Sequence, residues 1–212
     1  AVRWSENPRG RLMRVMVLHA HPVETSFNRS LFNTVTETLK ARGHEVDPVD
    51  LYAEGFDPVL SREDRLRYHD VPDNITPALK PYVDRLHAAD ALVVVFPVWN
   101  YGFPAILKGY FDKVFMPGVS FILEGGDDTD KGKLMPNLRN IKKVAFVTTY
   151  GGDRLRTMVM GDPPRRMAKR WGWVTFGGWL PPTYLALYDM NNATPERLTG
   201  FREKVRRTFA AW

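Results

Sequence analysis

The sequence predicts an α/β fold in which a doubly wound, five-stranded parallel sheet carries helices on both faces. Two observations lead to this prediction. Short apolar runs alternate along the chain with longer segments whose apolar residues recur every three or four positions, as strands and amphipathic helices do. No internal repeat is present, and 212 residues are enough for one sizeable core but few for two. Residues 13–212 are therefore expected to form a single domain.

Composition excludes several classes of protein. Hydrophobic residues make up 44% and charged residues 25% of the chain, as in ordinary globular proteins. No apolar run approaches the roughly 20 residues that span a bilayer, and the first residues lack the apolar core of a signal peptide. Because the chain has no Cys, disulfides, thiolate catalysis and Cys-ligated metals are excluded. We expect a cytoplasmic protein that does not insert into a membrane.

The net charge of +6 is not arranged as in a nucleic-acid-binding protein. The 30 Lys and Arg residues are interleaved with 24 Asp and Glu residues, so no binding to nucleic acid is expected. The densest basic cluster has two interpretations: a solvated helix face, or a guide for anionic ligands such as pyridine-nucleotide phosphates. The cluster consists of Arg165, Arg166, Lys169 and Arg170.

Residues 1–12 are expected to be an extension outside the domain. They show no periodicity and include Pro8 and Gly10. Two interpretations remain open. One is a native start at Met13, just before the first expected strand. The other is an arm that packs on a partner subunit, with Trp4 as its anchor.

The first two strands flank a helix. Arg14 and the apolar residues 15–18 predict a strand, and an amphipathic helix is expected from about residue 26 or 27 to residue 41, before Gly43. Residues 44–51 form a short second strand. Pro48 inside that strand predicts an edge position, because proline cannot donate a ladder hydrogen bond.

The third strand is the apolar run 91–95, which has the length and β-branched content of a buried parallel strand. A helix over residues 76–88 precedes it, and a second amphipathic helix over about 103–115 follows it. Two long polar connections, 52–75 and 118–140, are expected to be functional or to lie at an interface.

The last part of the chain predicts two more strands and two helices. Residues 143–149 are expected to form the fourth strand, and the extended, aromatic segment 173–188 is expected to be the fifth. Asp162 before Pro163 is typical of a capped helix start. A final amphipathic helix is expected from Thr194.

Five parallel strands suit the flavodoxin-like order 2-1-3-4-5, whose ligands bind at the carboxyl ends of the strands, between strands one and three. The first strand is not followed by Gly-x-Gly-x-x-Gly, which argues against a dinucleotide-binding Rossmann domain. The loops after strands one and three, residues 19–28 and 97–103, are also the richest in polar and aromatic side chains. The ligand site is therefore expected at these two loops.

The chemistry of these loops favours a flat, anionic ligand. Three rings, those of Trp99, Tyr101 and Phe103, suit a conjugated system. The segment 21–28 precedes a helix N-terminus, which favours a phosphate cradle with His21 at its edge, although plain capping by Ser26 explains it too.

A third loop follows the fourth strand. Gly151 and Gly152 would let a ligand approach the backbone closely, although a plain turn explains them equally well. No metal site is expected, because the only close pair, His19 and His21, lies at a strand end where alternate side chains point to opposite faces.

Six motifs are spread over residues 13–212: His21-x-x-x-Thr25-Ser-Phe-Asn28, Asp50-Leu-Tyr, Phe56-Asp-Pro, Phe96-Pro, Pro104-Ala-Ile-Leu-Lys-Gly-x-Phe111 and Thr148-Thr-x-Gly. Together they resemble the NAD(P)H:quinone oxidoreductase (DT-diaphorase) family, the flavodoxin-like flavoenzymes that include bacterial modulators of drug activity. The resemblance implies a bound flavin, usually FAD, and a homodimer with active sites at the subunit interface.

The resemblance also implies roles for individual residues. Tyr101, Tyr150 and Gly151 are the expected catalytic residues. The flavin phosphate and ribityl chain would be held by His21, Thr25, Ser26, Phe27 and Asn28, and the isoalloxazine by Pro97, Val98, Trp99, Asn100, Tyr101, Thr148, Thr149, Tyr150 and Gly151.

The chain departs from the family pattern at three positions. Asn100 stands where members often have an aromatic residue, which would make the wall facing the ring more polar. Tyr150 replaces a common glycine and would narrow the entrance. Met160 falls about where mammalian quinone reductases carry a His that, with a Tyr, assists charge transfer, so this relay is missing and efficient quinone reduction is in question.

The leading hypothesis is an NAD(P)H oxidoreductase that transfers hydride through FAD, or FMN, to quinone-like aromatic acceptors in a ping-pong reaction. The alternative is a flavodoxin-like ancillary subunit of a glutathione-gated potassium efflux system with residual reductase activity. A small electron carrier is disfavoured, because such flavodoxins are acidic. The sequence leaves open FAD against FMN, NADH against NADPH, and the acceptor.

Overall fold

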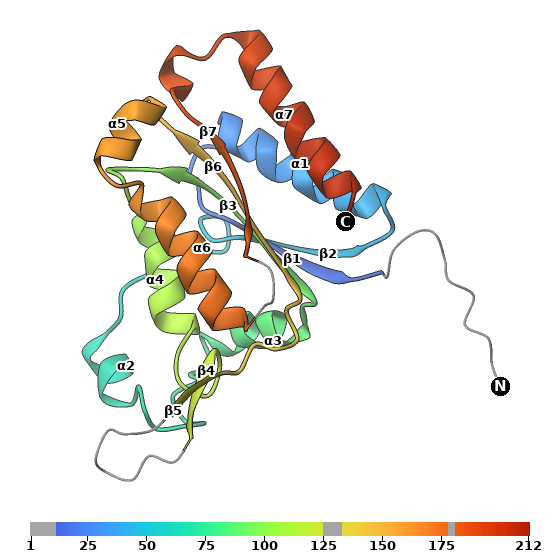
Figure 1. Ribbon diagram of the computed structural model, residues 1–212. Coiled ribbons are helices and arrows are strands. Elements are labelled where there is room, and N and C mark those ends of the chain that lie inside the picture. The colour runs from blue at the N-terminus through green and yellow to red at the C-terminus, as the bar shows by residue number, and fades with distance from the viewer. Residues whose placement is uncertain (1–11, 125–132, 178–180) are drawn as a thin grey trace, which may run out of the picture.

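The computed structural model describes residues 12–124, 133–177 and 181–212. Its middle layer is a five-stranded, all-parallel sheet in the order β2-β1-β3-β6-β7 (Figure 1). If the five strands of this sheet are numbered one to five in chain order, their order in the sheet is 2-1-3-4-5. The predicted order is therefore confirmed. The strands are β1 (Arg14–His19), β2 (Glu45–Asp50), β3 (Ala91–Val98), β6 (Lys143–Tyr150) and β7 (Thr183–Leu187).

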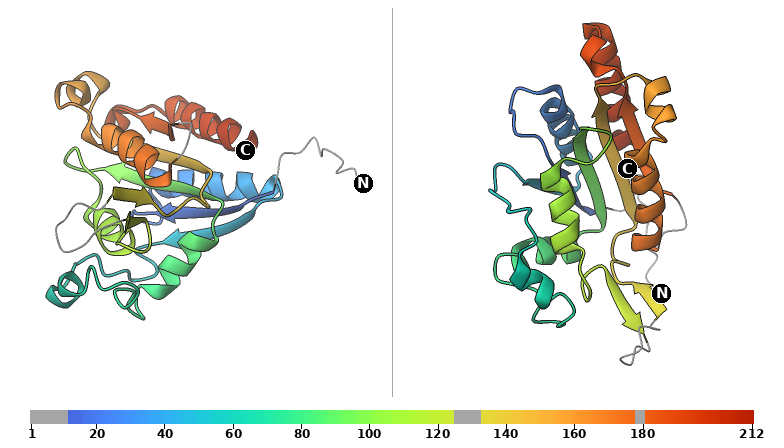
Figure 2. Two further views of the ribbon diagram at one scale, coloured as in Figure 1. Left: turned by 60° about the horizontal axis from the view of Figure 1, so that its bottom comes forward. Right: turned by 90° about the vertical axis from the view of Figure 1, so that its left-hand side faces the viewer.

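Helices cover both faces of the sheet. One face packs against two helices, α1 (Phe27–Ala41) and α7 (Pro195–Ala210). The other face packs against three helices, α3 (Lys80–Ala88), α4 (Ala105–Val114) and α6 (Pro163–Phe176) (Figures 1 and 2). Across the described residues, no helix combines the length and apolar character needed to cross a membrane.

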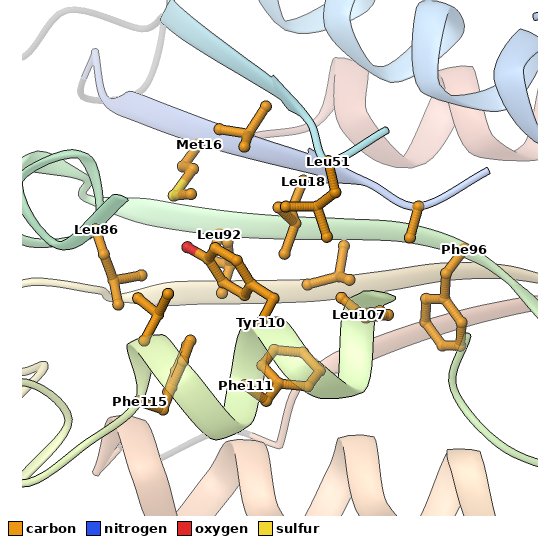
Figure 3. Close-up of a cluster of buried hydrophobic side chains, with 14 of the residues drawn as sticks. Met16, Leu18, Leu51, Leu86, Leu92, Phe96, Leu107, Tyr110, Phe111 and Phe115 are labelled. Atoms are coloured by element: carbon orange, nitrogen blue, oxygen red, sulfur yellow. The ribbon is translucent and has the colours of Figure 1, made fainter. Parts of the chain in front are cut away.

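Strand β3 is the centre of the core. All eight of its residues are buried, because β1 and β6 flank it and helices cover both its faces, so the strand is continuously apolar instead of alternating. On the face that packs against α4, Leu92 and Phe96 face Leu107, Tyr110 and further α4 residues (Figure 3). This rigid centre fixes where the loop after β3 begins.

Local signals set the ends of the first helix and the place of the second strand. Helix α1 begins at Phe27, capped by the Ser26 hydroxyl, which accepts a hydrogen bond from the Arg29 backbone N–H at 3.1 Å. Gly43, with φ of +90°, ends the turn after α1. Strand β2, which contains Pro48, pairs only with β1 and lies at the sheet edge, as predicted.

The prediction for the fifth strand was too long. Strand β7 covers only Thr183–Leu187, and the aromatic residues up to Phe176 belong to α6. Phe176 and Trp171 both pack against Phe115, the residue that follows α4, so tertiary contacts determine that this segment is helical. Gly177, with φ of +58°, ends α6, and residues 178–180 lie outside the described part of the chain.

The two long connections contain regular structure that the sequence did not predict. Within 52–75, α2 (Arg62–Leu66) begins with a capping box formed by Ser61 and Asp64. Within 118–140, β4 (Phe121–Glu124) pairs antiparallel with β5 (Lys133–Pro136). In Figure 1 and the right-hand view of Figure 2, α2 and this hairpin lie at the opposite end of the molecule from α5 (Arg154–Val159).

Two further expectations concern boundaries. Helix α3 begins at Lys80, later than the predicted residue 76, because residues 76–79 form hydrogen-bonded turns before it. Residues 1–11, with the proposed anchor Trp4, and residues 125–132 lie outside the described residues, so the extension at 1–12 stays a prediction.

Candidate functional site

Three loops meet at the carboxyl ends of β1, β3 and β6. The His21 ring lies 5.6 Å from the Trp99 ring, which joins the first loop to the second. A Cβ added to Gly152 would lie 4.0 Å from the Tyr101 hydroxyl, which joins the second loop to the third. In Figure 1 this edge of the sheet lies on the side where α5 is drawn. The sequence placed a ligand site at these loops.

The loop after β3 is a tight two-residue turn. Trp99 and Gly102 exchange backbone hydrogen bonds of 3.3 and 2.9 Å, and between them Asn100 and Tyr101 both have positive φ, +48° and +57°. Such a turn has the type I′ pattern, which Asn tolerates and a bulky Tyr does not favour. Strained backbone of this kind clusters at binding sites.

This turn presents an aromatic ring and backbone donors to solvent. Trp99 is 42% exposed and Asn100 is also exposed, although both follow a fully buried strand. The backbone N–H groups of Asn100 and Tyr101 do not donate in either of the two hydrogen bonds between Trp99 and Gly102. The turn therefore offers donors beside a flat apolar surface.

The loop after β1 forms one side of the site. The His21 Nδ1 atom accepts a hydrogen bond from the Val23 backbone N–H at 3.0 Å. Burial lowers the pKa of His21 below its ordinary value, so the ring is neutral at pH 7 and its Nε2–H remains a donor. The Ser26 hydroxyl caps α1, while Thr25 is exposed beside the first-turn N–H groups of that helix.

Asn28 and Thr148 each have a buried side-chain oxygen that lacks a hydrogen-bond partner among the described residues. Asn28 is 2% exposed, and its Nδ2 donates to the Thr149 Oγ1 at 3.5 Å, but its Oδ1 accepts nothing. The hydroxyl of Thr148, which is fully buried, is also unpaired. Because buried polar atoms are nearly always hydrogen-bonded, these two atoms are suited to a polar ligand.

His19, Asp50 and Arg29 form a group of interacting side chains beneath the first loop, which the sequence analysis did not predict. His19 is fully buried at the end of β1, and its Nδ1 lies 3.4 Å from the Asp50 carboxylate, which also pairs with Arg29 of α1. Burial lowers the pKa of His19 from 6.5 to about 4, so it is neutral at pH 7. The group ties β1, β2 and α1 together under the proposed phosphate cradle.

Tyr150 lies in the core and does not narrow an entrance, contrary to the expectation. It is 1% exposed, and its hydroxyl donates to the Asp162 carboxylate at 2.6 Å and lies 2.6 Å from the Tyr184 hydroxyl. The ring stacks on that of Tyr188 at 4.5 Å. Burial raises the pKa of Tyr150 far above its ordinary value, so the side chain cannot exchange a proton near neutral pH.

Helix α6 begins at Pro163 with Asp162 in the N-cap position, as predicted, but the expected capping by the Asp162 side chain is wrong. The Asp162 backbone is left-handed, with φ of +44°, and its side chain makes no capping hydrogen bond. Instead its carboxylate accepts from Tyr150 and from the Tyr188 hydroxyl at 3.0 Å. The residue connects the loop after β6 to α6 and β7.

The segment after β6 contains the short helix α5, which presents apolar side chains to solvent. Met160 is 54% exposed and carries no group that can exchange a proton, as the sequence indicated. Four side chains form this exposed patch: Leu155, Met158, Val159 and Met160. Contiguous apolar patches of this kind mark interaction surfaces.

A cleft of about 630 Å³ opens beside the turn after β3, between α4 and α6. Tyr101 lines it together with Gly102, so the cleft and the turn share residues. The remaining lining residues are Phe103, Lys108, Pro163, Pro164, Arg166, Met167, Arg170 and Trp171.

Comparison with known proteins places this architecture in a family. Residues 13–207 match a family whose members have the flavodoxin-like fold. The chain belongs to this flavodoxin-like family. It is 32% identical over 148 residues to an Escherichia coli K12 protein named uncharacterized NAD(P)H oxidoreductase YcaK, covering 70% of this chain and 69% of that protein.

Two further relatives of this flavodoxin-like protein carry the quinone reductase name. NAD(P)H dehydrogenase [quinone] 1 of Cavia porcellus is 32% identical over 168 residues, which is 71% of this chain but only 59% of that protein. The solved NAD(P)H:quinone oxidoreductase from Methanothermobacter marburgensis has a TM-score of 0.78 and 25% identity, over 94% of this chain and 98% of that one. The resemblance drawn from the motifs is confirmed.

The residues at the three loops suit a flavin. The α1 N-terminus suits its phosphate, the turn at 99–102 suits its ring, and the unpaired atoms of Asn28 and Thr148 suit its polar groups. Among the described residues, no three His, Cys, Asp or Glu side chains gather as metal ligands.

Proposed function

We propose that this protein is a flavin-dependent NAD(P)H oxidoreductase that reduces quinone-like aromatic acceptors. The observation that carries the proposal is the strained turn at 99–102, which presents an exposed indole and free N–H groups beside a helix N-terminus. The names of the relatives support the same activity.

The cofactor is FAD, with FMN as the alternative. When bound, the flavin supplies the redox chemistry: it takes a hydride from NADH or NADPH and passes it to the acceptor in a ping-pong reaction. The first-turn N–H groups of α1, Thr25 and the neutral His21 would bind the phosphate. Asn28 and Phe27 would flank the ribityl chain.

The ring would lie on the loops after β3 and β6. Pro97, Val98 and Trp99 would support it, and backbone N–H groups of Asn100 and Tyr101 would donate to its polar edge. On the other side, the backbone of Gly151 would complete the site. The hydroxyl of Thr149 accepts from Asn28 and keeps its own O–H as a donor, and the Thr148 hydroxyl has no partner among the described residues.

Charge that develops on the ring would be stabilised by backbone donors and not by a side-chain relay. Met160 has no proton to exchange, and the Tyr150 hydroxyl is held by Asp162 and Tyr184. Preorganised N–H groups stabilise developing negative charge effectively. Tyr101, half-buried at the mouth of the cleft, is the aromatic side chain best placed to contact an acceptor.

We further propose that the protein works as a homodimer in the cytoplasm. The exposed apolar side chains of α5 lie directly after the flavin loop, so a second subunit packed on them would border the site. The alternative function, an ancillary subunit of a glutathione-gated potassium efflux system, is compatible with the lack of a relay at Met160 and with the long connections 52–75 and 118–140. Steady-state rates together with co-purification from membranes carrying such a system distinguish the two.

The experiment that tests the main proposal starts from the purified chain, desalted and then incubated with FAD or FMN. We expect one flavin per chain, identified by chromatography after release, and rapid bleaching of its absorbance by NADH or NADPH in a stopped-flow instrument. A chain that takes up neither flavin refutes the proposal. A chain that takes up flavin but is not reduced by either nicotinamide refutes the oxidoreductase part alone.

A further inference from the structure

The cleft between α4 and α6 has the size and lining of a small-molecule site. Its volume of about 630 Å³ lies within the range of such sites, which bury most of a ligand against apolar and aromatic side chains. Its walls are formed by Phe103, Pro163, Pro164, Met167 and Trp171. A flat aromatic body fits walls of this composition.

The charged side chains that line the cleft are all cationic. Lys108, Arg166 and Arg170 line it, and no acidic side chain does. The Lys108 charge is already paired with Asp112, one turn along α4. Arg166 and Arg170 are four residues apart on α6, so their side chains extend from the same face of that helix. These two guanidinium groups are the charges most available to an anion.

The structure divides the basic cluster that the sequence presented as one group. Arg165 turns away from the cleft: its Nη1 contacts the Tyr188 hydroxyl at 3.4 Å, and its guanidinium lies 5.7 Å from the Tyr184 ring centre. Lys169 also does not line the cleft. The cluster is therefore not uniform: Arg166 and Arg170 line the cleft, whereas Arg165 and Lys169 do not.

The cleft also adjoins the site described above. Tyr101 and Gly102 form part of both the strained turn and the cleft wall. Phe103 lies behind them, in edge contact with Phe96 of β3 at 5.0 Å and Phe111 of α4 at 5.6 Å, so this wall is held by the core. A molecule in the cleft would touch the turn that we propose supports the flavin ring.

We propose that this cleft is a specificity site for aromatic acceptors that carry a carboxylate or sulfonate group. The aromatic body lies against Phe103, Met167 and Trp171, and the anionic group pairs with Arg166 and Arg170. Guanidinium groups bind such oxyanions in bidentate geometry and pack well on aromatic rings. The proposal rests on the proposed function, because it names the substrates for which that activity is selective.

Kinetics with a matched pair of acceptors tests the proposal. The flavin-loaded protein is assayed with 1,4-naphthoquinone-2-sulfonate and with the neutral 2-methyl-1,4-naphthoquinone. We expect Arg166→Gln and Arg170→Gln each to raise KM for the sulfonate about five- to tenfold, with kcat and both constants for the neutral quinone unchanged. Lys169→Gln, on the same helix but outside the cleft, is the control and should change nothing. Equal effects on both quinones, or none, overturn the proposal.

A binding measurement separates this proposal from the oxidoreductase activity. Naphthalene-2-sulfonate, which is not reduced, is titrated into the protein by calorimetry at low and at physiological salt, with 2-naphthylmethanol as the neutral probe. We expect the sulfonate to bind more tightly and to lose this advantage in Arg166→Gln and Arg170→Gln, whether or not the protein oxidises NAD(P)H. Equal affinity for both probes refutes the site. Sedimentation would also refute the site if the wild type is a dimer and the two variants are monomers, because a second subunit would then occupy the cleft.

Discussion

The stability of this protein is expected to fall on mild acidification because of one buried histidine. In the folded chain the pKa of His19 is about 4, compared with 6.5 when it is exposed in the unfolded chain. At pH 7 both states bind little proton at this residue. As the pH falls to 5, the unfolded chain becomes almost fully protonated there, while the folded chain stays almost unprotonated. Because the unfolded chain binds more protons, the free energy of unfolding decreases as the pH falls.

The magnitude follows from the two pKa values. The full slope of about 1.4 kcal/mol per pH unit applies only below the unfolded pKa of 6.5, so the roughly 1.5 units from there to pH 5 cost about 2 kcal/mol in the free energy of unfolding. The neighbouring Asp50, whose pKa is lowered, loses its contribution only at more acidic pH. His21 and His44, whose pKa values burial also lowers, act in the same direction and remain in every variant.

Urea unfolding at pH 7 and pH 5 measures the effect, with wild type and His19→Gln compared at each pH. The variant cannot take up a proton at residue 19, so its loss between the two pH values should be about 2 kcal/mol smaller. Absolute stability also changes, because the ring contact of His19 with Phe32 at 4.7 Å is removed, but the difference between pH values is independent of that contact. Identical losses in both proteins refute the assignment of His19 as buried and neutral.

Three further predictions, two of them with a matched control substitution, test other parts of the structure. Tyr150→Phe removes a hydrogen bond to the Asp162 carboxylate and should lower the free energy of unfolding by about 2 kcal/mol in urea titrations; no loss would contradict the network. Gly109→Ala places a Cβ 2.2 Å from a backbone oxygen and should destabilise by at least about 2 kcal/mol, whereas Gly200→Ala, with nothing within 4 Å on an exposed helix, should stabilise by up to about 1 kcal/mol; a similar effect of both in thermal melts would contradict the packing. Asn100→Ala should weaken flavin binding, measured by fluorescence titration, more than Asn100→Gly does, because alanine disfavours the left-handed backbone at this residue.

The sequence predicts the sheet well because buried parallel strands have a strong local signature. The run at β3 is apolar without alternation, which only a strand covered on both faces requires. Once the strand order is known, the carboxyl ends of β1 and β3 must be neighbours, so the position of the candidate site follows from topology. The identity of the ligand proposed for this site still depends on the family resemblance and on the side chains that the turn exposes.

The errors come from features that local sequence does not encode. The aromatic residues before Gly177 are compatible with a strand or a helix. They form a helix because Trp171 and Phe176 pack on Phe115, the residue that follows α4. For Tyr150 a signal was present: side chains alternate along β6, so Tyr150 points to the opposite face from Thr149, which contacts α1. The position of Tyr150 in a ligand loop concealed that it lies on the face of the sheet packed against α6.

The departure at Asn100 has a backbone reason as well as a chemical one. Two consecutive left-handed residues are costly unless they are glycine, by roughly 1–2 kcal/mol each, and asparagine is among the side chains that reduce this cost. The paired bonds between Trp99 and Gly102 offset part of the strain, and hydrogen bonds from the free N–H groups to a ligand would offset more. Asn100 therefore favours the strained turn before the ligand arrives, so its substitution should affect flavin affinity more than the stability of the empty fold.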